Sequence, residues 1–426
     1  MSFVTISVIG LGYIGLPTAA MFASRKIKVI GVDVNQKTVD TINRGEIHIV
    51  EPDLDTLVAK AVADGYLKAT MTPEEAEAFL IAVPTPFKPS GKGEIPEPDL
   101  TYIKSASMAI APVLKKGDLV ILESTSPVGA TEKMAGWLAK ERTDLSFPQQ
   151  AGKEADISIA HCPERVLPGY VVQELVNNDR VIGGITSKCS KRAVELYQIF
   201  VEGECVITNS RTAEMAKLTE NASRDVSIAF ANELSMICDD FDIDVWELIA
   251  LANRHPRVDI LQPGPGVGGH CIAVDPWFIV SETPNISKLI HTARIINDSK
   301  PEWVVNKVKQ AIWNFLQANP ERSVSNVTVA CYGLAFKANI DDLRESPSLD
   351  ITKNIISQHA GIVIAIEPNI HELPEQLKDT CKLITAEEAI ISADVHVLLV
   401  DHKEFIGLKL SKIDCDYLID TKGIWK

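Results

Sequence analysis

Thr5-Ile6-Ser7-Val8-Ile9-Gly10-Leu11-Gly12-Tyr13-Ile14-Gly15 is the stretch that decides the fold. Its β-branched start predicts a strand, the residues after it predict a helix, and residues 29–32 predict a second strand that Asp33 closes. Glycines spaced G-x-G-x-x-G between a strand and a helix allow a tight turn and close approach of a pyrophosphate, while the acid binds ribose hydroxyls. The pattern predicts a dinucleotide-binding Rossmann domain. Its cofactor should be NAD, because Asp33 would repel the 2′-phosphate of NADP. We expect cofactor contacts at Gly10, Gly12, Tyr13, Ile14, Gly15 and Asp33.

Further strands are predicted at residues 78–83, 118–123 and 157–162. The carboxyl ends of the strands line the ligand crevice of an open α/β sheet. Thr85, Ser124 and Thr125 follow the first two ends, so we expect them to face the cofactor or the substrate; capping of the next helix is the alternative. Glu164 and Arg165 follow the third end and are candidates for substrate contact.

A long helix is predicted from Ser210, with apolar residues recurring at Met215, Leu218, Ala222, Val226, Phe230 and Leu234. Lys217, Asn221 and Asp225 recur every four residues and therefore share another face. Lys217 and Asn221 could direct two donors at one substrate oxygen. An ordinary solvated ladder of polar side chains is the alternative.

Residues 264–276, Gly-Pro-Gly-Val-Gly-Gly-His-Cys-Ile-Ala-Val-Asp-Pro, predict a loop built for close approach, because glycine and proline disfavour helix and strand. The glycines leave access to the sulfur of Cys271, and Asp275 follows four residues later. We interpret Cys271 as a nucleophile; a buried structural cysteine is the alternative. His161-Cys162 and His270-Cys271 lack a recognised zinc-ligand spacing, so no metal is predicted.

The last third predicts a second, smaller Rossmann-like unit, with strands at residues 327–334, 362–366 and 395–400. Lys337 and Arg344 follow its first strand and would suit the diphosphate of a nucleotide, with Lys337 expected at the substrate and Arg344 at the cofactor. Surface charges in a loop are the alternative for both. Residues 301–326 predict a helix and linker between domains.

The expected architecture is α/β throughout, with three domains. These are an NAD-binding Rossmann domain at 1–200, a central helical domain with the cysteine loop at 201–310, and a smaller Rossmann-like domain at 311–426. A chain of 426 residues with a formal net charge of −15 fits several soluble domains, and that charge argues against nucleic acid or an anionic membrane as the main partner. We find neither a signal peptide nor a membrane-spanning run, and the eight scattered cysteines indicate reduced thiols, so we expect a cytoplasmic protein.

A nicotinamide site accounts for hydride transfer, but a simple alcohol dehydrogenase needs no thiol. A cysteine becomes useful when it captures an aldehyde as a thiohemiacetal, which a second NAD oxidises to a thioester for hydrolysis. The glycine-rich motifs and the Lys217/Asn221 helix, together with Glu123-Ser124-Thr125-Ser126-Pro127-Val128-Gly129 and Arg344-Glu345-Ser346-Pro347, resemble those of the nucleotide-sugar 6-dehydrogenases, the UDP-glucose/GDP-mannose dehydrogenase family. The resemblance covers nearly the whole chain in order.

The resemblance is strongest to the branch acting on UDP-N-acetylhexosamines. It implies four-electron oxidation of C6 of UDP-N-acetyl-D-mannosamine to the uronic acid, for bacterial surface polysaccharide such as enterobacterial common antigen. It also implies a homodimer joined by the long helix, with dimerisation assigned to the domain at 201–310 and binding of the UDP-sugar to the domain at 311–426. By the same carry-over, Cys271 is the nucleophile, Lys217 and Asn221 stabilise the oxyanion, Asp275 helps to activate water, Thr125 positions that water, and Glu164 assists acid–base steps. The expected substrate contacts are Glu164, Arg165, Lys217, Asn221, Arg257, Gly268 and Lys337.

Two departures from the UDP-glucose branch put glucose in doubt, since this chain has Pro168 where that branch has glutamate and Val274 where it has lysine. No physical argument from the sequence separates UDP-N-acetyl-D-mannosamine from UDP-N-acetyl-D-glucosamine. Two further hypotheses stay open at this point. One is a two-electron NAD dehydrogenase in which Cys271 is structural, and the second is a nucleotide-binding protein without turnover.

Overall fold

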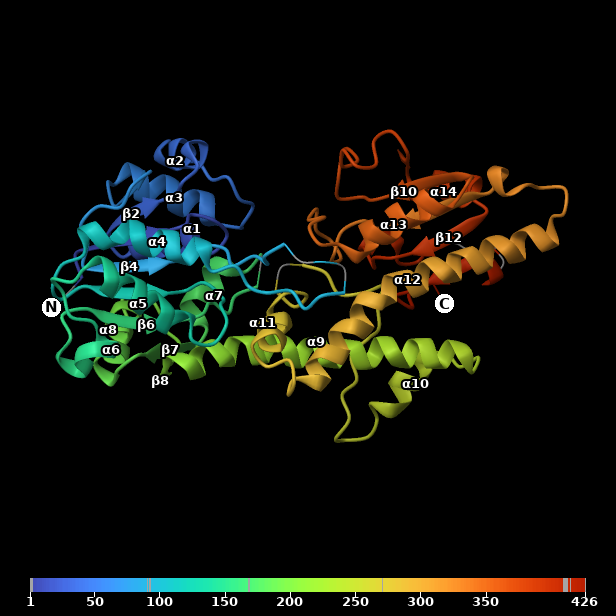
Figure 1. Cartoon of the computed structure of the whole chain (residues 1–426). Coiled ribbons are helices and arrows are strands. Elements are labelled where there is room, and N and C mark those ends of the chain that lie inside the picture. Colours follow the sequence, from blue (N-terminus) through green and yellow to red (C-terminus); the bar gives the residue numbers. More distant parts are fainter. Residues whose placement is uncertain are drawn as a thin grey trace. The chain divides into compact units, whose positions relative to one another are not determined.

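The computed structural model describes residues 3–89, 91, 93–167, 169–269, 271–408, 413 and 415–425. The chain divides into two compact units, Met1–Glu220 and Asn221–Lys426. Each unit contains a largely parallel sheet with helices packed on it (Figure 1).

The first unit contains an eight-stranded sheet in the order β3-β2-β1-β4-β5-β6-β7-β8, as far as the described residues show. Neighbouring strands are parallel, except that β6 and β7 are antiparallel. From β1 the chain proceeds to β2 and β3 on one side of the sheet and then crosses back to β4 on the other side of β1. This reversal of strand order creates the crevice typical of a Rossmann fold. The strands are β1 (Thr5–Ile9), β2 (Lys28–Val32), β3 (Leu67–Thr70), β4 (Ala78–Ile81), β5 (Leu119–Leu122), β6 (Ser158–His161), β7 (Arg180–Gly184) and β8 (Cys205–Asn209).

Helices cover both faces of this sheet, because its strands are apolar on both sides. One core packs α1, α3, α7 and α8 on the sheet around Leu16, Val58 and Tyr197, and the other packs α4 and α5 around Ile110 and Met134. The helices of the unit are α1 (Gly15–Ser24), α2 (Gln36–Asn43), α3 (Leu54–Ala63), α4 (Thr101–Ile110), α5 (Ala130–Glu141), α6 (Pro148–Ala151), α7 (Val171–Asn177) and α8 (Ser187–Tyr197). The predicted α/β class is confirmed.

The second unit holds a parallel sheet in the order β11-β10-β9-β12-β13, which confirms the predicted Rossmann-like fold. Its two cores pack α12 and α13 on one face, and α14 with Tyr332 and Phe405 on the other. The strands are β9 (Thr328–Tyr332), β10 (Ile362–Ile366), β11 (Lys382–Leu383), β12 (Val395–Leu398) and β13 (Leu418–Asp420). The helices are α10 (Val245–Ala252), α11 (Asp275–Glu282), α12 (Lys288–Ala318), α13 (Pro347–Gln358) and α14 (Ala386–Ser392).

Two long helices differ in how well the sequence predicted them. The helix expected from Ser210 is α9 (Ser210–Asp240), which crosses the division between the two units. The helix expected within 301–326 is part of α12, which begins earlier, at Lys288, and continues through Pro301. The boundary expected after residue 310 lies inside this helix. None of the helices in the described part of the chain is both long and apolar enough to span a bilayer.

Candidate active site

The glycines of the first loop serve different purposes. Gly10 has φ +91°, and a Cβ there would lie 2.6 Å from the carbonyl oxygen of Ala82. A Cβ at Gly15 would overlap the carbonyl oxygen of Gly10. A Cβ at Gly12 would meet nothing within 4 Å, so packing among the described residues does not require glycine there. A ligand that approaches the backbone closely would require it, as the pyrophosphate of NAD does.

Asp33 holds the same loop from the end of β2. Its carboxylate accepts the backbone N–H of Leu11 at 3.0 Å and that of Asn35 at 2.9 Å. The side chain is half-buried, so lone pairs remain for ribose hydroxyls. Ile14 caps α1 without a side-chain hydrogen bond, the N–H of Leu16 donates to the carbonyl of Gly12 at 3.1 Å, and Tyr13 is exposed. These residues fit NAD.

The ends of β4 and β5 carry the three hydroxyl residues expected near a ligand. The hydroxyl of Thr85 is buried and has no hydrogen-bond partner among the described residues. Ser124 donates to the carbonyl of Val83 at 2.6 Å, and so ties the ends of the two strands together rather than capping a helix. Thr125 is half-buried next to it.

Glu214 of α9 caps the helix that follows these residues. Its carboxylate accepts the backbone N–H groups of Gly129 and Thr131 at 2.6 and 2.8 Å, and the Thr131 hydroxyl at 2.6 Å. Its bonds to the start of α5 fix the segment that carries Thr125.

Glu164 is a buried carboxylate in an ion pair that the sequence did not reveal. Arg180 of β7 donates to its Oε2 at 2.6 Å, and the backbone N–H of Arg165 donates to Oε1 at 2.7 Å. The Arg165 side chain instead turns to Glu220, at 2.7 Å. An arginine directly before the apolar residues Val181 and Ile182 is the signal that could have identified Arg180, because a charge that is buried beside such residues needs a partner.

A second buried acid, Glu123, lies close to this pair. The hydroxyl of Tyr197 donates to its Oε1 at 2.6 Å, and the Arg180 guanidinium lies 5.2 Å from the centre of the Tyr197 ring. Burial raises the pKa of Glu123 to about 7. Arg180 therefore lies near two different carboxylates. Glu164 is paired with it directly, whereas Glu123 has a raised pKa and is more easily protonated.

The cysteine loop leads directly into α11. Cys271 is exposed, and its carbonyl accepts the backbone N–H of Asp275, the first residue of the helix, at 2.9 Å. Asp275 is buried, and its carboxylate accepts the side-chain amide of Asn221 at 2.5 Å. The structure thus brings Asn221, Asp275 and the Cys271 segment together. Lys217 is half-buried one turn before Asn221 on α9.

Asp225 does not continue a solvated ladder. It is fully buried and pairs with Arg294 of α12 at 2.6 Å, while Asn297 donates to the same carboxylate at 2.8 Å. At Asp225, the polar face of α9 is therefore turned to the interior of the second unit. Spacing alone could not reveal this, because the partners lie on α12.

The middle of the cysteine loop packs on the segment between β9 and α13. A Cβ at Gly268 would lie 2.5 Å from the carbonyl oxygen of Glu345, 2.7 Å from Cδ of Pro347 and 2.9 Å from Cβ of Phe336. The N–H of Gly269 donates to that Glu345 carbonyl at 3.3 Å. Glu345 has φ +47°, a conformation that costs a non-glycine residue energy and that persists here at a loop contact.

Three further residues predicted to contact ligands lie in exposed loops. Arg344 donates twice to the carboxylate of Asp342, at 2.9 and 2.6 Å, and Lys337 and Arg257 are exposed. The ligands expected at these three residues stay predictions.

Glu367 repeats in the second sheet what Asp33 does in the first. It ends β10 and accepts the backbone N–H groups of Leu334 and Asn369, as Asp33 accepts those of Leu11 and Asn35. Unlike Asp33, Glu367 is buried, and His402 contacts its Oε2 at 3.0 Å.

No cluster of three or more histidine, cysteine or acidic side chains suited to a metal occurs in the part of the chain that the structure describes. Burial lowers the pKa of His161 to about 3 and raises that of Cys162 to about 12. His270 and Pro168 lie outside the described residues.

Comparisons with known proteins give matches to one family in three successive parts of the chain. Models of the UDP-glucose/GDP-mannose dehydrogenase family match in three parts, namely the NAD binding domain at residues 4–201, the central domain at 211–299 and the UDP binding domain at 330–426. The chain is 65% identical to UDP-N-acetyl-D-mannosamine dehydrogenase of Yersinia pestis over the full length of both. It is 60% identical to NDP-N-acetyl-D-galactosaminuronic acid dehydrogenase of Ralstonia solanacearum, over 100% of this chain and 97% of the relative. The solved UDP-D-ManNAc dehydrogenase of Pyrococcus horikoshii is 38% identical with a TM-score of 0.85, over 99% of this chain and 96% of that one.

Replacing Gly12 by alanine should impair NAD binding without impairing folding. A Cβ there meets no described atom, but it enters the space through which a pyrophosphate approaches the loop. We expect the Kd for NAD, measured by calorimetry, to rise roughly tenfold, which corresponds to about 1.4 kcal/mol. Gly136→Ala in α5, another open position, is the matched control and should bind NAD normally. Normal NAD binding by Gly12→Ala would contradict this assignment.

Gly268→Ala should destabilise the second unit, while Gly264→Ala should not. The new methyl group at residue 268 collides with the Glu345 backbone and Pro347, whereas the nearest atom to a Cβ at residue 264 is 3.8 Å away. Overpacking of this kind costs about 1–3 kcal/mol. Thermal unfolding followed by circular dichroism should therefore show a lower Tm for Gly268→Ala only. Equal midpoints for the two variants would argue against the packed loop.

Proposed function

The chain belongs to the UDP-glucose/GDP-mannose dehydrogenase family, and we propose that it oxidises C6 of UDP-N-acetyl-D-mannosamine to a carboxylate in two steps. In each oxidation NAD, when bound, accepts one hydride. The reaction consumes the alcohol, two NAD and one water, and yields the uronic acid, two NADH and protons. We place the reaction in the cytoplasm, in the synthesis of a surface polysaccharide such as enterobacterial common antigen, on the strength of the resemblance alone.

The observation that carries the proposal is the hydrogen bond of 2.5 Å between Asn221 and Asp275, at the end of the segment that exposes Cys271. A side-chain amide has two N–H groups, and Asp275 accepts one of them. We assign the second N–H group to an oxyanion. An oxyanion donor stabilises the negative oxygen of each tetrahedral adduct on a sulfur.

In the proposed sequence the Cys271 sulfur attacks the aldehyde carbon, and the carbonyl electrons move to oxygen to form a thiohemiacetal. Loss of hydride from that carbon gives a thioester. Water then attacks the thioester carbon, and the carbon–sulfur bond breaks to regenerate Cys271. Lys217 and Asn221 supply positive charge and a donor to the oxyanion in both addition steps.

Asp275, Thr125 and Glu164 are proposed to manage water and protons. Asp275 is buried and next to the nucleophile segment, which suits its carboxylate to orient an attacking water. Glu164 accepts hydrogen bonds from Arg180 and from the backbone N–H of Arg165. A carboxylate has about four lone-pair sites, so it can accept a further hydrogen bond.

The sugar assignment is supported by the relatives rather than by the site geometry. Relatives named for UDP-N-acetyl-D-mannosamine reach 65% identity, and a relative named for a galactosaminuronic acid reaches 60%. All of these names contain an N-acetylhexosamine unit. UDP-N-acetyl-D-glucosamine is the alternative that the sequence left open.

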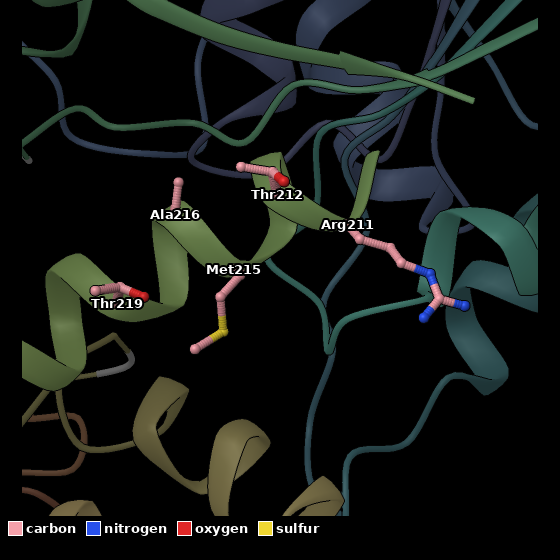
Figure 2. Close-up of a pocket in the computed structure, with 5 residues that line it drawn as sticks. All are labelled: Arg211, Thr212, Met215, Ala216 and Thr219. Atoms are coloured by element: carbon pink, nitrogen blue, oxygen red, sulfur yellow. The ribbon is translucent and has the colours of Figure 1, made fainter. Parts of the chain in front are cut away.

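We also propose that α9 joins two copies of the chain. Met215, Phe230 and Ile237 are 38%, 51% and 45% exposed, and their spacing places them along one side of the helix. Near its start, α9 borders an open hollow of about 550 Å³, which Figure 2 shows with the Met215 side chain projecting from the helix. A second copy of the same helix offers a matching apolar surface.

The NADH yield at limiting sugar tests the reaction. With UDP-N-acetyl-D-mannosamine we expect about two NADH per sugar, because the thioester route removes two hydrides. Cys271→Ser should lose this turnover, and Cys415→Ser, at another exposed cysteine, should keep it. Parallel assays with the glucosamine and galactosamine sugars report specificity.

A yield near one NADH, or turnover indifferent to Cys271, would leave an ordinary two-electron dehydrogenase. Binding of NAD and sugar without any NADH would indicate a protein without turnover. A higher kcat/KM for another UDP-sugar would overturn the assignment of UDP-N-acetyl-D-mannosamine as the substrate, but not the proposed reaction.

The α9 interface is tested by charge at its centre. Phe230→Asp combined with Ile237→Asp should convert a dimer into a monomer, measured by size-exclusion chromatography with light scattering, because burying two carboxylates costs several kcal/mol. Arg224→Asp, at an exposed position on the opposite side of α9, is the control and should stay dimeric. A wild-type monomer would refute the proposal directly.

A further inference from the structure

The segment that carries Cys271 is attached to α9 at both ends. At its far end Asp275 accepts the amide of Asn221 at 2.5 Å. At its near end the backbone N–H of Gly264 donates to Oδ1 of Asn232 at 2.9 Å. The two asparagines lie about three turns apart on one helix. One of them belongs to the proposed chemistry, and the other has no role in it.

Gly264 depends on Asn232 because of its neighbours in the chain. Pro263 and Pro265 have no backbone N–H, so Gly264 provides the one donor of a Pro-Gly-Pro sequence whose three residues are all buried. A buried N–H that lacks an acceptor is strongly unfavourable. The Asn232 side chain supplies that acceptor.

Asn232 is itself held in one orientation. It is fully buried, and its Nδ2 donates to Oδ1 of Asn297 at 2.9 Å. Asn297 in turn donates to Asp225 at 2.8 Å, and Arg294 pairs with the same carboxylate at 2.6 Å. Because Asn297 accepts from the Nδ2 of Asn232, the Oδ1 of Asn232 is directed at the N–H of Gly264.

We propose that Asn232 is a positioning residue for Cys271, acting through the start of the glycine loop. The inference rests on the nucleophilic role of Cys271 in the proposed function. Glycines at residues 264, 266, 268 and 269 have little stiffness of their own, so the loop takes its position from its attachments. Of the attachments at its two ends, the Asn232 contact can be removed without touching a proposed catalytic group.

The test compares Asn232→Leu with Asn297→Leu. The two substitutions are identical, affect the same buried network and preserve the branching of the side chain, but only the first removes the acceptor of Gly264. We expect kcat of Asn232→Leu to fall roughly tenfold to a hundredfold, with KM values within about twofold, because misplacing a reacting group by about 1 Å has effects of this size. Asn297→Leu removes a group that orients Asn232 but keeps the acceptor of Gly264, so we expect kcat to fall by no more than about threefold.

Two readouts are independent of turnover. Alkylation of Cys271 by iodoacetamide, quantified on its peptide, should change rate severalfold in Asn232→Leu and remain close to wild type in Asn297→Leu. Hydrogen exchange at the Gly264 amide should be slow in the wild type and in Asn297→Leu, and fast in Asn232→Leu. Both remain interpretable if the NADH yield rejects the thioester route.

Equal loss of kcat and equal alkylation rates in the two variants would show general loosening and overturn the proposal. So would an unchanged kcat in Asn232→Leu. If Asn232→Leu does not fold, hydrogen exchange of the wild-type protein tests the proposal instead. Rapid exchange at the Gly264 amide would exclude a stable hydrogen bond to Asn232.

Discussion

The hydrogen bond between the Asn221 amide and the Asp275 carboxylate is the contact on which the candidate site depends. It joins α9 to the first residue of α11, and the Cys271 carbonyl accepts the backbone N–H of that same residue. The proposed nucleophile, an amide donor and an acid are therefore held together by two adjacent hydrogen bonds. Burying a carboxylate is unfavourable unless a donor is bonded to it, and Asp275 is buried. The hydrogen bond to Asp275 therefore fixes the position of the Asn221 side-chain amide.

Buried polar contacts give α9 a role in both units. Near its start Glu214 caps α5 in the first unit, and farther along Asp225 pairs with Arg294 in the second. The first contact fixes the segment that carries Thr125, and the second joins α9 to α12. A helix held only by apolar packing would tolerate small rotations and shifts, whereas hydrogen bonds between buried charged and amide groups have strict geometry.

The sequence predicted the fold well where the evidence was local. The glycine loop with Asp33 and the period of α9 depend on neighbours in the chain, and they predicted the elements around them. Strands β7 and β8 were missed, because β7 ends in two glycines and the side chains of β8 are largely exposed, so neither reads as a typical buried strand. Partners such as Arg180 for Glu164 and Arg294 for Asp225 could not be predicted, because spacing does not say which distant element supplies the opposite charge. The roles of Lys337, Arg344 and Arg257 remain predictions for the same reason.

The contrast between Asp33 and Glu367 has a consequence for how the second sheet could be re-engineered. Both acids brace the turn after the first strand of their sheet, but Glu367 also contacts His402 and is closed off from solvent. Installing a glycine-rich turn after β9 would therefore not be enough to create a second dinucleotide site, because the Glu367 carboxylate is already engaged and a ribose could not reach it. A redesign would have to begin at His402, with a smaller side chain that uncovers the acid, and only then change the turn.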